Sequence, residues 1–149
     1  MSYRRPVQVL VYPVRSTDDG WRYLLLHRVA ERGSFWQGVT GGAEWGEGLP
    51  DAARREMLEE TGFRPIELLC IDCTYAFPMQ YEWKNNYLPG TLKIEEHVFL
   101  AVVQGAEPVL SPEEHDDWRW CAYEEALGLL AWAENVEALR CCWRVLENR

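Results

Sequence analysis

The sequence lacks an apolar run long enough to span a bilayer, and its first residues lack the apolar core of a signal peptide. Basic residues are also few, with 15 Lys and Arg against 24 Asp and Glu among 149 residues. Because nucleic acids and anionic membranes attract basic surfaces, we expect neither as a partner. The acidic excess leaves open a protein that collects cations.

A disulfide framework is lacking as well, because the five cysteines are odd in number and no secretion signal accompanies them. We therefore expect a cytoplasmic protein with reduced thiols. No repeat, low-complexity tract or linker divides the chain, and its hydrophobic content of 48% is ordinary for a globular protein. The sequence thus predicts a single domain over residues 1–149.

Strand-forming segments alternate with a few helical ones. Apolar and β-branched runs predict strands at residues 7–14, 21–27, 35–40, 66–75, 95–103 and 118–122. Helical spacing predicts helices at 51–61, 123–130 and 134–146, and the span 77–90 is expected to be a long loop or hairpin over one face. Most connections between strands are too short to contain a helix, which favours an α+β fold over a purely parallel sheet.

The expected helix at 51–61 carries most of the candidate functional residues. At 100° per residue, three of its glutamates fall within an arc of about 100°. These are Glu56, Glu59 and Glu60. The arc lies on the same half of the helix as Met57, whereas Arg54 and Thr61 mark its polar side. We therefore expect the three glutamates to point toward the protein or the edge of a cleft.

Carboxylates gathered in this way need a counter-charge. At an effective dielectric constant near 20, two carboxylates about 7 Å apart repel each other by ~2.4 kcal/mol, against ~0.2–0.5 kcal/mol on a solvated helix face. Because the candidate ligands are all oxygen atoms, a hard ion such as Mg²⁺ or Mn²⁺ is expected rather than zinc. Hard ions held by carboxylates commonly meet phosphate groups, which indicates a polyphosphate substrate.

Residues 41–63 resemble the Nudix box, the sequence signature of the Nudix hydrolases. All of the defining positions match, namely Gly41, Glu47, Arg55, Glu56, Glu59, Glu60 and Gly62, together with the apolar Met57 and Phe63. Such a match arises by chance with a probability on the order of 10⁻⁷. The resemblance implies an α/β/α sandwich around a mixed β-sheet, in which the box forms a loop, a helix and a second loop. It also implies an enzyme that hydrolyses a nucleoside diphosphate linked to another group.

The same resemblance implies roles for individual residues. The expected ligands of Mg²⁺, for which Mn²⁺ could substitute, are the carbonyl of Gly41 and the carboxylates of Glu56, Glu59 and Glu60. Arg55 would orient these carboxylates. Members of the family differ in which glutamate acts as the general base, so Glu56, Glu59 and Glu114, the last of which lies outside the box, are all candidates.

Features outside the box are similar to the bacterial subgroup of dATP pyrophosphohydrolases, or dihydroneopterin triphosphate pyrophosphatases. They include segments 35–37 and 87–90 and the pair Glu114-His115. This similarity implies that a nucleoside triphosphate or dihydroneopterin triphosphate is cleaved to the monophosphate and pyrophosphate. The positions of Pro78 and Tyr81 after the box resemble those of residues typical of ADP-ribose hydrolases and of dinucleoside polyphosphate hydrolases, respectively. Both activities stay open as alternatives. A Nudix module that senses a nucleotide without hydrolysis is a further alternative.

Three side chains outside the box are candidates for substrate contact. Trp36 could stack on a base or belong to the core, Arg28 could bind phosphate, and Tyr81 could line a cleft for a ring. His97 and His115 have no ligand-type residues at metal spacing, so we expect neither to bind a metal. The expected partner is thus a small-molecule polyphosphate, and the oligomeric state is left open.

Overall fold

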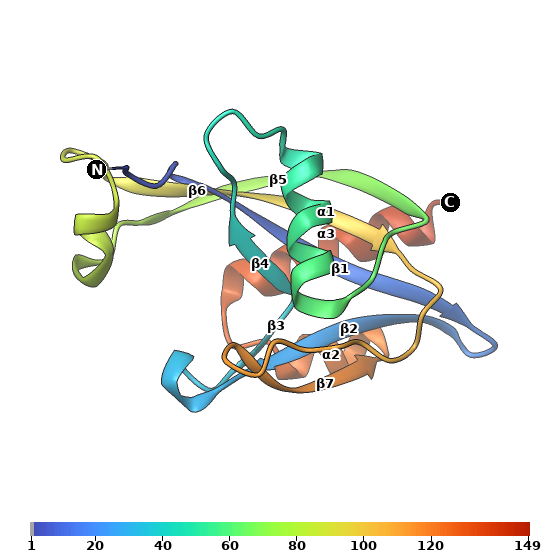
Figure 1. Cartoon of the computed structure of the whole chain (residues 1–149). Helices are drawn as coiled ribbons and strands as arrows, with labels where there is room; N and C mark the ends of the chain where they lie inside the picture. The colour runs from blue at the N-terminus through green and yellow to red at the C-terminus, as the bar shows by residue number, and fades with distance from the viewer. Residues whose placement is uncertain (1) are drawn as a thin grey trace.

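A mixed β-sheet lies between helix α1 on one face and helices α2 and α3 on the other (Figure 1). The computed structural model describes residues 2–149, so the predicted domain includes one residue, Met1, outside the described part. The strands are β1 (Val7–Thr17), β2 (Gly20–Arg28), β3 (Trp36–Gln37), β4 (Val39–Gly42), β5 (Glu67–Pro78), β6 (Lys93–Val102) and β7 (His115–Cys121). The arrangement confirms the predicted α+β fold with three layers.

The helices occupy the positions that the sequence indicates. They are α1 (Leu49–Thr61), α2 (Tyr123–Leu129) and α3 (Ala133–Glu147), with short 3-10 helices η1 (Ala30–Arg32) and η2 (Tyr81–Asn86). None of the helices within residues 2–149 is long and apolar enough to cross a membrane.

The central strand β1 determines how the sheet is assembled. One edge of β1 pairs in parallel with β6, from Val7 opposite Glu95 to Val14 opposite Val102. Its other edge pairs antiparallel with β4 over the first half and with β2 over the second half. Because β2 turns away from β1, strand β4 takes its place beside β1, and the box therefore begins in the middle of the sheet.

Alternation along β1 divides the interior into two cores. Leu10 and Tyr12 face α2 and α3, whereas Val9 and Val11 face α1, and all four side chains are fully buried. Successive side chains of a strand point to opposite faces, so a continuous apolar run is the pattern of a strand covered on both sides. Met57 anchors α1 on its face of the sheet and is also fully buried.

The first and last residues of α1 show why the helix has these limits. Pro50 occupies the first turn, where its missing N–H is not needed. Gly62 ends the helix in the left-handed region at φ 76°. Thr61, which we placed on the polar side, is instead buried. Its hydroxyl donates to the carbonyl of Met57 at 2.6 Å and accepts the N–H of Phe63 at 3.1 Å, so it needs no water.

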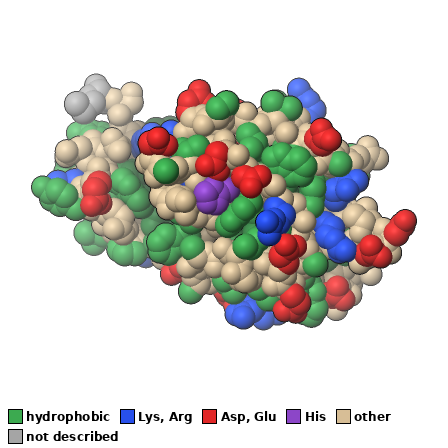
Figure 2. Space-filling model, turned by 90° about the horizontal axis from the view of Figure 1, so that it is seen from below, with side chains coloured by type: hydrophobic (Ala, Val, Ile, Leu, Met, Phe, Trp, Pro, Cys, Tyr) green, Lys and Arg blue, Asp and Glu red, His purple; other side chains and the backbone are tan. Residues whose placement is uncertain are grey.

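A projection that we call the arm, residues 77–93, extends beyond the body of the sheet (Figure 1). The expected loop or hairpin forms here, but it projects past the end of the sheet instead of lying over one face, because β5 continues to Pro78 and β6 begins at Lys93, with η2 between them (Figure 1). Large apolar side chains are exposed on the arm, namely Tyr81, Trp83, Leu88 and Leu92. Figure 2 shows hydrophobic side chains gathered at this end of the molecule.

The packing of α1 on the sheet can be tested by truncating one side chain at its interface. Met57→Ala leaves a cavity between α1 and the sheet, so we expect a loss of about 2–5 kcal/mol in the free energy of unfolding. The adjacent Leu58 is 40% exposed, and Leu58→Ala should cost less than ~1 kcal/mol. Urea denaturation in EDTA measures both values, and equal losses would contradict the placement of the helix.

Candidate active site

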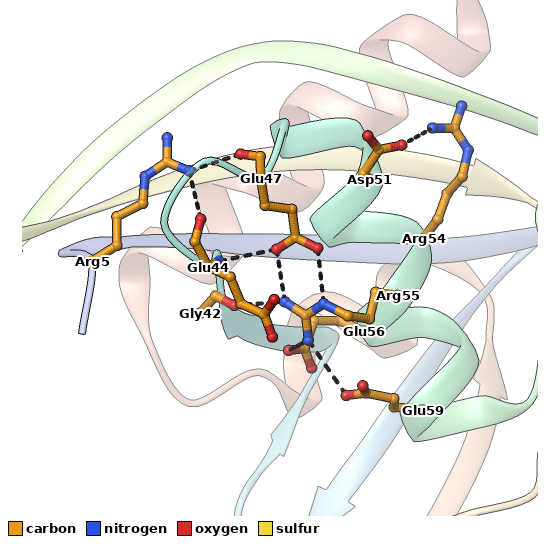
Figure 3. Close-up of polar contacts among 9 residues, drawn as sticks. All are labelled: Arg5, Gly42, Glu44, Glu47, Asp51, Arg54, Arg55, Glu56 and Glu59. Atoms are coloured by element: carbon orange, nitrogen blue, oxygen red, sulfur yellow. Dashed lines mark hydrogen bonds and ion pairs between the residues drawn. The ribbon is translucent and has the colours of Figure 1, made fainter. Parts of the chain in front are cut away.

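Arg55 connects the helix of the box to the loop before it (Figure 3). Its guanidinium donates to both carboxylate oxygens of Glu47, each at 2.9 Å, and to the carbonyl of Gly42 at 2.9 Å. It also donates to Glu56 at 2.9 Å and lies 3.5 Å from Glu59. The hydrogen bond with Glu47 raises the pKa of Arg55 and lowers the pKa of Glu47. Arg55 therefore stays charged and orients two candidate metal ligands.

The loop between β4 and α1, residues 43–48, is held by side chains that hydrogen-bond to its backbone. The N–H of Glu44 donates to the carboxylate of Glu47 at 3.0 Å. From the N-terminal segment, Arg5 donates to the carbonyls of Glu44 and Glu47 at 3.0 and 2.8 Å. Gly46 has φ 79°, a conformation that favours glycine. The loop is thus fixed from both sides before any ligand binds.

Gly41 and Glu56 touch where β4 meets α1. A Cβ atom built on Gly41 would lie 2.0 Å from the carboxyl carbon of Glu56 and 2.3 Å from both of its oxygens. No larger residue fits without moving Glu56. The contact places the backbone of Gly41 beside the Glu56 carboxylate, which suits their predicted roles as ligands of one ion.

Glu60 is the most deeply buried carboxylate of the box, with 2% of its surface exposed. Neither of its oxygens has a hydrogen-bond partner among residues 2–149. Burial, followed by the adjacent carboxyl group of Glu56 and then by the charge of Glu114, raises its pKa to about 10. An ionised carboxylate in this position needs a positive charge that the chain does not supply in full.

The segment before β7 brings Glu114 to this cluster. The hydroxyl of Ser111 donates to the carbonyl of Glu59 at 3.2 Å, and the N–H of Val29 donates to the carbonyl of Glu114 at 3.0 Å. Glu60, Glu114 and His115 each offer one ligand atom, and these three atoms lie within 4.8 Å of one another. The predicted candidate base outside the box therefore lies beside the box.

His115 lies beside Glu60 and Glu114, although the spacing of residues in the sequence predicted no ligand-type side chains near it. Its Nε2 is 3.7 Å from a carboxylate oxygen of Glu60, too long for a hydrogen bond, and both ring nitrogens are buried without a partner among the described residues. Burial lowers its pKa to about 4, so the ring is neutral at pH 7. Its position next to Glu114 was the one feature of the sequence that could have linked His115 to the site. The contact with Glu60 could not be predicted, because the two residues are far apart in the sequence.

The oxygen atoms of the cluster fit a hard divalent cation. The two unpartnered oxygens of Glu60 and the nearby carboxylate of Glu114 are donors of the kind that Mg²⁺ prefers, and the neutral ring of His115 adds a nitrogen to the same group. Glu59 differs from its neighbours, because 58% of its side chain is exposed. We expected all three glutamates to face inward or toward a cleft edge. Glu60 is buried, Glu56 is partly buried with 12% of its side chain exposed, and Glu59 lies at the exposed edge of the arc.

The three expected substrate contacts lie in different parts of the fold. Arg28, at the end of β2, lies close enough to Glu60 and Glu114 for their charges to raise its pKa, although burial outweighs them and lowers it. Trp36 packs on the face of the sheet that α2 and α3 cover, opposite α1. Tyr81 is 77% exposed on the arm, with the Lys84 ammonium over its ring. The structure thus brings Arg28 to the carboxylates, and the roles of Trp36 and Tyr81 stay predictions.

Comparisons with known proteins agree with this geometry. The family model of the NUDIX domain matches residues 4–140. Dihydroneopterin triphosphate diphosphatase of Escherichia coli K12 is 33% identical over 141 residues, which cover 92% of this chain and 91% of that protein. A solved structure of the E. coli dihydroneopterin triphosphate pyrophosphohydrolase matches all of both chains with a TM-score of 0.73 and 29% identity.

A second relative is much longer than this chain. An octanoyltransferase of Myxococcus xanthus is 40% identical over 123 residues. The match covers 83% of this chain and 32% of that protein, so the chain spans about a third of its length.

The contact between Gly41 and Glu56 predicts that a single methyl group disturbs the site. Gly41→Ala must displace the Glu56 carboxylate, and we expect Mg²⁺ affinity, measured by calorimetry, to fall by about 10- to 100-fold. Gly42→Ala is the matched control, because a Cβ atom there meets nothing within 4 Å. Equal Mg²⁺ affinity of the two folded variants would contradict the predicted ligand pair.

Proposed function

The chain belongs to the NUDIX hydrolase family, and we propose that it uses Mg²⁺ to hydrolyse a phosphoric anhydride bond in a nucleoside or pterin triphosphate. The products are the corresponding monophosphate and pyrophosphate. Family membership and the E. coli relative support pyrophosphohydrolase activity on nucleotide-like substrates. The choice of a dATP-like or dihydroneopterin substrate draws on the name of the E. coli relative and on similarities outside the box.

One observation carries this proposal: the buried Glu60 carboxylate, whose two oxygens have no partner among residues 2–149. Glu56 and Glu114 lie close enough to oppose its ionisation. Like charges brought together at an effective dielectric constant near 20 repel by a few kcal/mol per pair, on the order of 2 kcal/mol at 7 Å. In the metal-free protein, protonation of Glu60 relieves this repulsion, whereas a divalent cation relieves it with the carboxylate ionised.

Several residues of the chain then take part in hydrolysis. The Gly41 carbonyl and the carboxylates of Glu56, Glu59 and Glu60 would hold the ion. A bound Mg²⁺ supplies Lewis acidity, which neutralises charge on the phosphate and favours ionisation of a water molecule. Arg55 keeps Glu56 and Glu47 in place through its hydrogen bonds.

Glu114 is our preferred general base, with Glu56 and Glu59 as alternatives within the box. Glu114 lies outside the box, but its carboxylate is next to the ligand atoms of Glu60 and His115. In this position a carboxylate oxygen of Glu114 can accept the proton of the attacking water. Arg28 lies beside the same carboxylates and contributes a positive charge to the phosphate that is attacked.

We also propose that the protein works in a reducing compartment, the cytoplasm. All five cysteines are free thiols. Two of them, Cys121 and Cys142, are buried in the core.

Replacement of one box glutamate separates its catalytic role from its effect on stability. Glu60→Gln should lower Mg²⁺-dependent turnover by about 100-fold or more, because the amide is a poor metal ligand. In EDTA the same variant should be more stable than the wild type at pH 8. The raised pKa keeps Glu60 protonated in the folded state, while the unfolded chain ionises above its ordinary pKa, so wild-type stability falls as the pH rises.

We expect Glu60→Gln to raise the melting temperature by about 3 °C or more at pH 8, with a smaller gain at pH 5. Glu59→Gln is the stability control, because its side chain is 58% exposed, and it should change the melting temperature little. Full turnover in Glu60→Gln would rule out the metal site, and an unchanged melting temperature would contradict the burial of an unpaired carboxylate.

The substrate class is tested by assaying one panel with identified products. The panel contains dATP and other dNTPs, dihydroneopterin triphosphate, ADP-ribose and diadenosine tetraphosphate. We expect the highest kcat/KM on a triphosphate, release of pyrophosphate, and loss of turnover in EDTA. Preference for ADP-ribose or the dinucleotide would favour the alternatives suggested by Pro78 and Tyr81. Tight nucleotide binding without any product would indicate a sensing module.

A further inference from the structure

A cavity of about 380 Å³ adjoins the box and has no role in the functions assigned so far. Three parts of the chain line this half-open cavity: the N-terminal segment 3–5, the loop 43–48, and the arm at Tyr87. Figure 1 shows the N-terminal segment running beside the arm. The volume lies within the ~300–1,000 Å³ that is typical of small-molecule sites.

Hydrogen bonds between these segments hold the cavity in shape. The N–H of Arg4 donates to the carbonyl of Asn86 at 2.7 Å, which ties the N-terminal segment to the arm. The indole Nε1 of Trp45 donates to the carbonyl of Tyr3 at 2.6 Å, which ties the loop to the N-terminal segment. Both bonds join residues that are far apart in sequence, so the cavity is formed by the fold and needs no ligand to assemble it.

The walls combine aromatic rings with charged side chains of both signs. Tyr3, Trp45 and Tyr87 supply the rings, and Trp45 is 59% exposed although its side chain is large and apolar. Aromatic side chains stack on planar bases, with a contribution of ~1–3 kcal/mol per base. Arg4 also lines the cavity, and its guanidinium forms no ion pair within residues 2–149. Glu44 and Glu56 balance the charges of Arg4 and Arg5 in this lining, so the walls suit a planar ring held by stacking, with the phosphates outside the cavity at the box.

One wall is shared with the candidate metal site. Glu56 lines the cavity, and the same carboxylate touches Gly41 and accepts a hydrogen bond from Arg55. A ligand seated in the cavity therefore has one end next to the box carboxylates. This continuity distinguishes the cavity from an isolated depression on the surface.

We propose that this cavity is the subsite for the planar nitrogen heterocycle of the substrate, with Trp45 as its exposed stacking platform. The phosphates then extend past Glu56 to the box. This inference rests on the proposed function, since it assigns the ring end of the same triphosphate. A purine base and a pterin share the planar, nitrogen-rich chemistry that stacking recognises.

Calorimetric titration in Mg²⁺ tests the subsite without requiring turnover. The probes are dAMP, dihydroneopterin monophosphate and inorganic tripolyphosphate, which has no ring. We expect Trp45→Ala to weaken at least one of the two ring-bearing probes by about tenfold or more, and tripolyphosphate by less than about twofold. The ring-bearing probe that binds the wild type more tightly identifies the heterocycle.

Two further variants separate stacking from structural effects. Trp45→Phe keeps an aromatic face but loses the bond to Tyr3, so it should retain most of the affinity for the ring-bearing probe. Trp132→Ala is the matched control, because Trp132 is 53% exposed and packs on Phe35 away from the cavity, and its affinities should equal those of the wild type.

Equal weakening of all probes by Trp45→Ala, or no weakening of any, would overturn the subsite, as would an equal loss in Trp45→Phe. Failure of the proposed function would look different: the wild type would hydrolyse no triphosphate in Mg²⁺, whatever the binding data show.

Discussion

The burial of the Glu60 carboxylate is the constraint on which the rest of the site depends. Its oxygens have no partner within the described chain, and two other carboxylates stand near it. In the metal-free protein, folding therefore raises the pKa of Glu60, whereas a bound cation would lower this pKa and favour the ionised carboxylate. The acidic excess of the whole chain is consistent with this, because six of its carboxylates fall in residues 41–63 against two arginines. An acidic protein can thereby act on an anionic substrate, since bound cations invert the local charge.

The sheet and Arg55 give this cluster its geometry. Because β1 pairs with β4 in the middle of the sheet, Gly41 emerges where α1 presents Glu56. Arg55 then fixes the loop to the helix through Glu47 and the Gly42 carbonyl. The same loop carries Trp45 to the neighbouring cavity. Metal ligands, their orienting cation and the proposed ring subsite thus share one short piece of chain, held on both sides by rigid elements.

Much of this could be predicted from the sequence, because it depends on local pattern. The β-branched run of β1, the limits of α1 and the spacing of the box glutamates are properties of neighbouring residues. Burial of Thr61 was missed because its hydroxyl is satisfied by its own helix. His115 beside Glu60, and the cavity lined by Tyr3 and Trp45, result from contacts across the fold. The spacing of residues in the sequence does not predict such contacts, because the contacts depend on which strands become neighbours in the fold.

The central claim is that a divalent cation occupies the carboxylate cluster. A crystal structure grown with Mn²⁺, with data collected at the manganese absorption edge, tests it most directly. We predict an anomalous peak in contact with the carboxylates of Glu56 and Glu60 and the carbonyl of Gly41. A structure in which Mn²⁺ binds elsewhere, or in which this cluster stays without a peak at millimolar Mn²⁺, would contradict the claim.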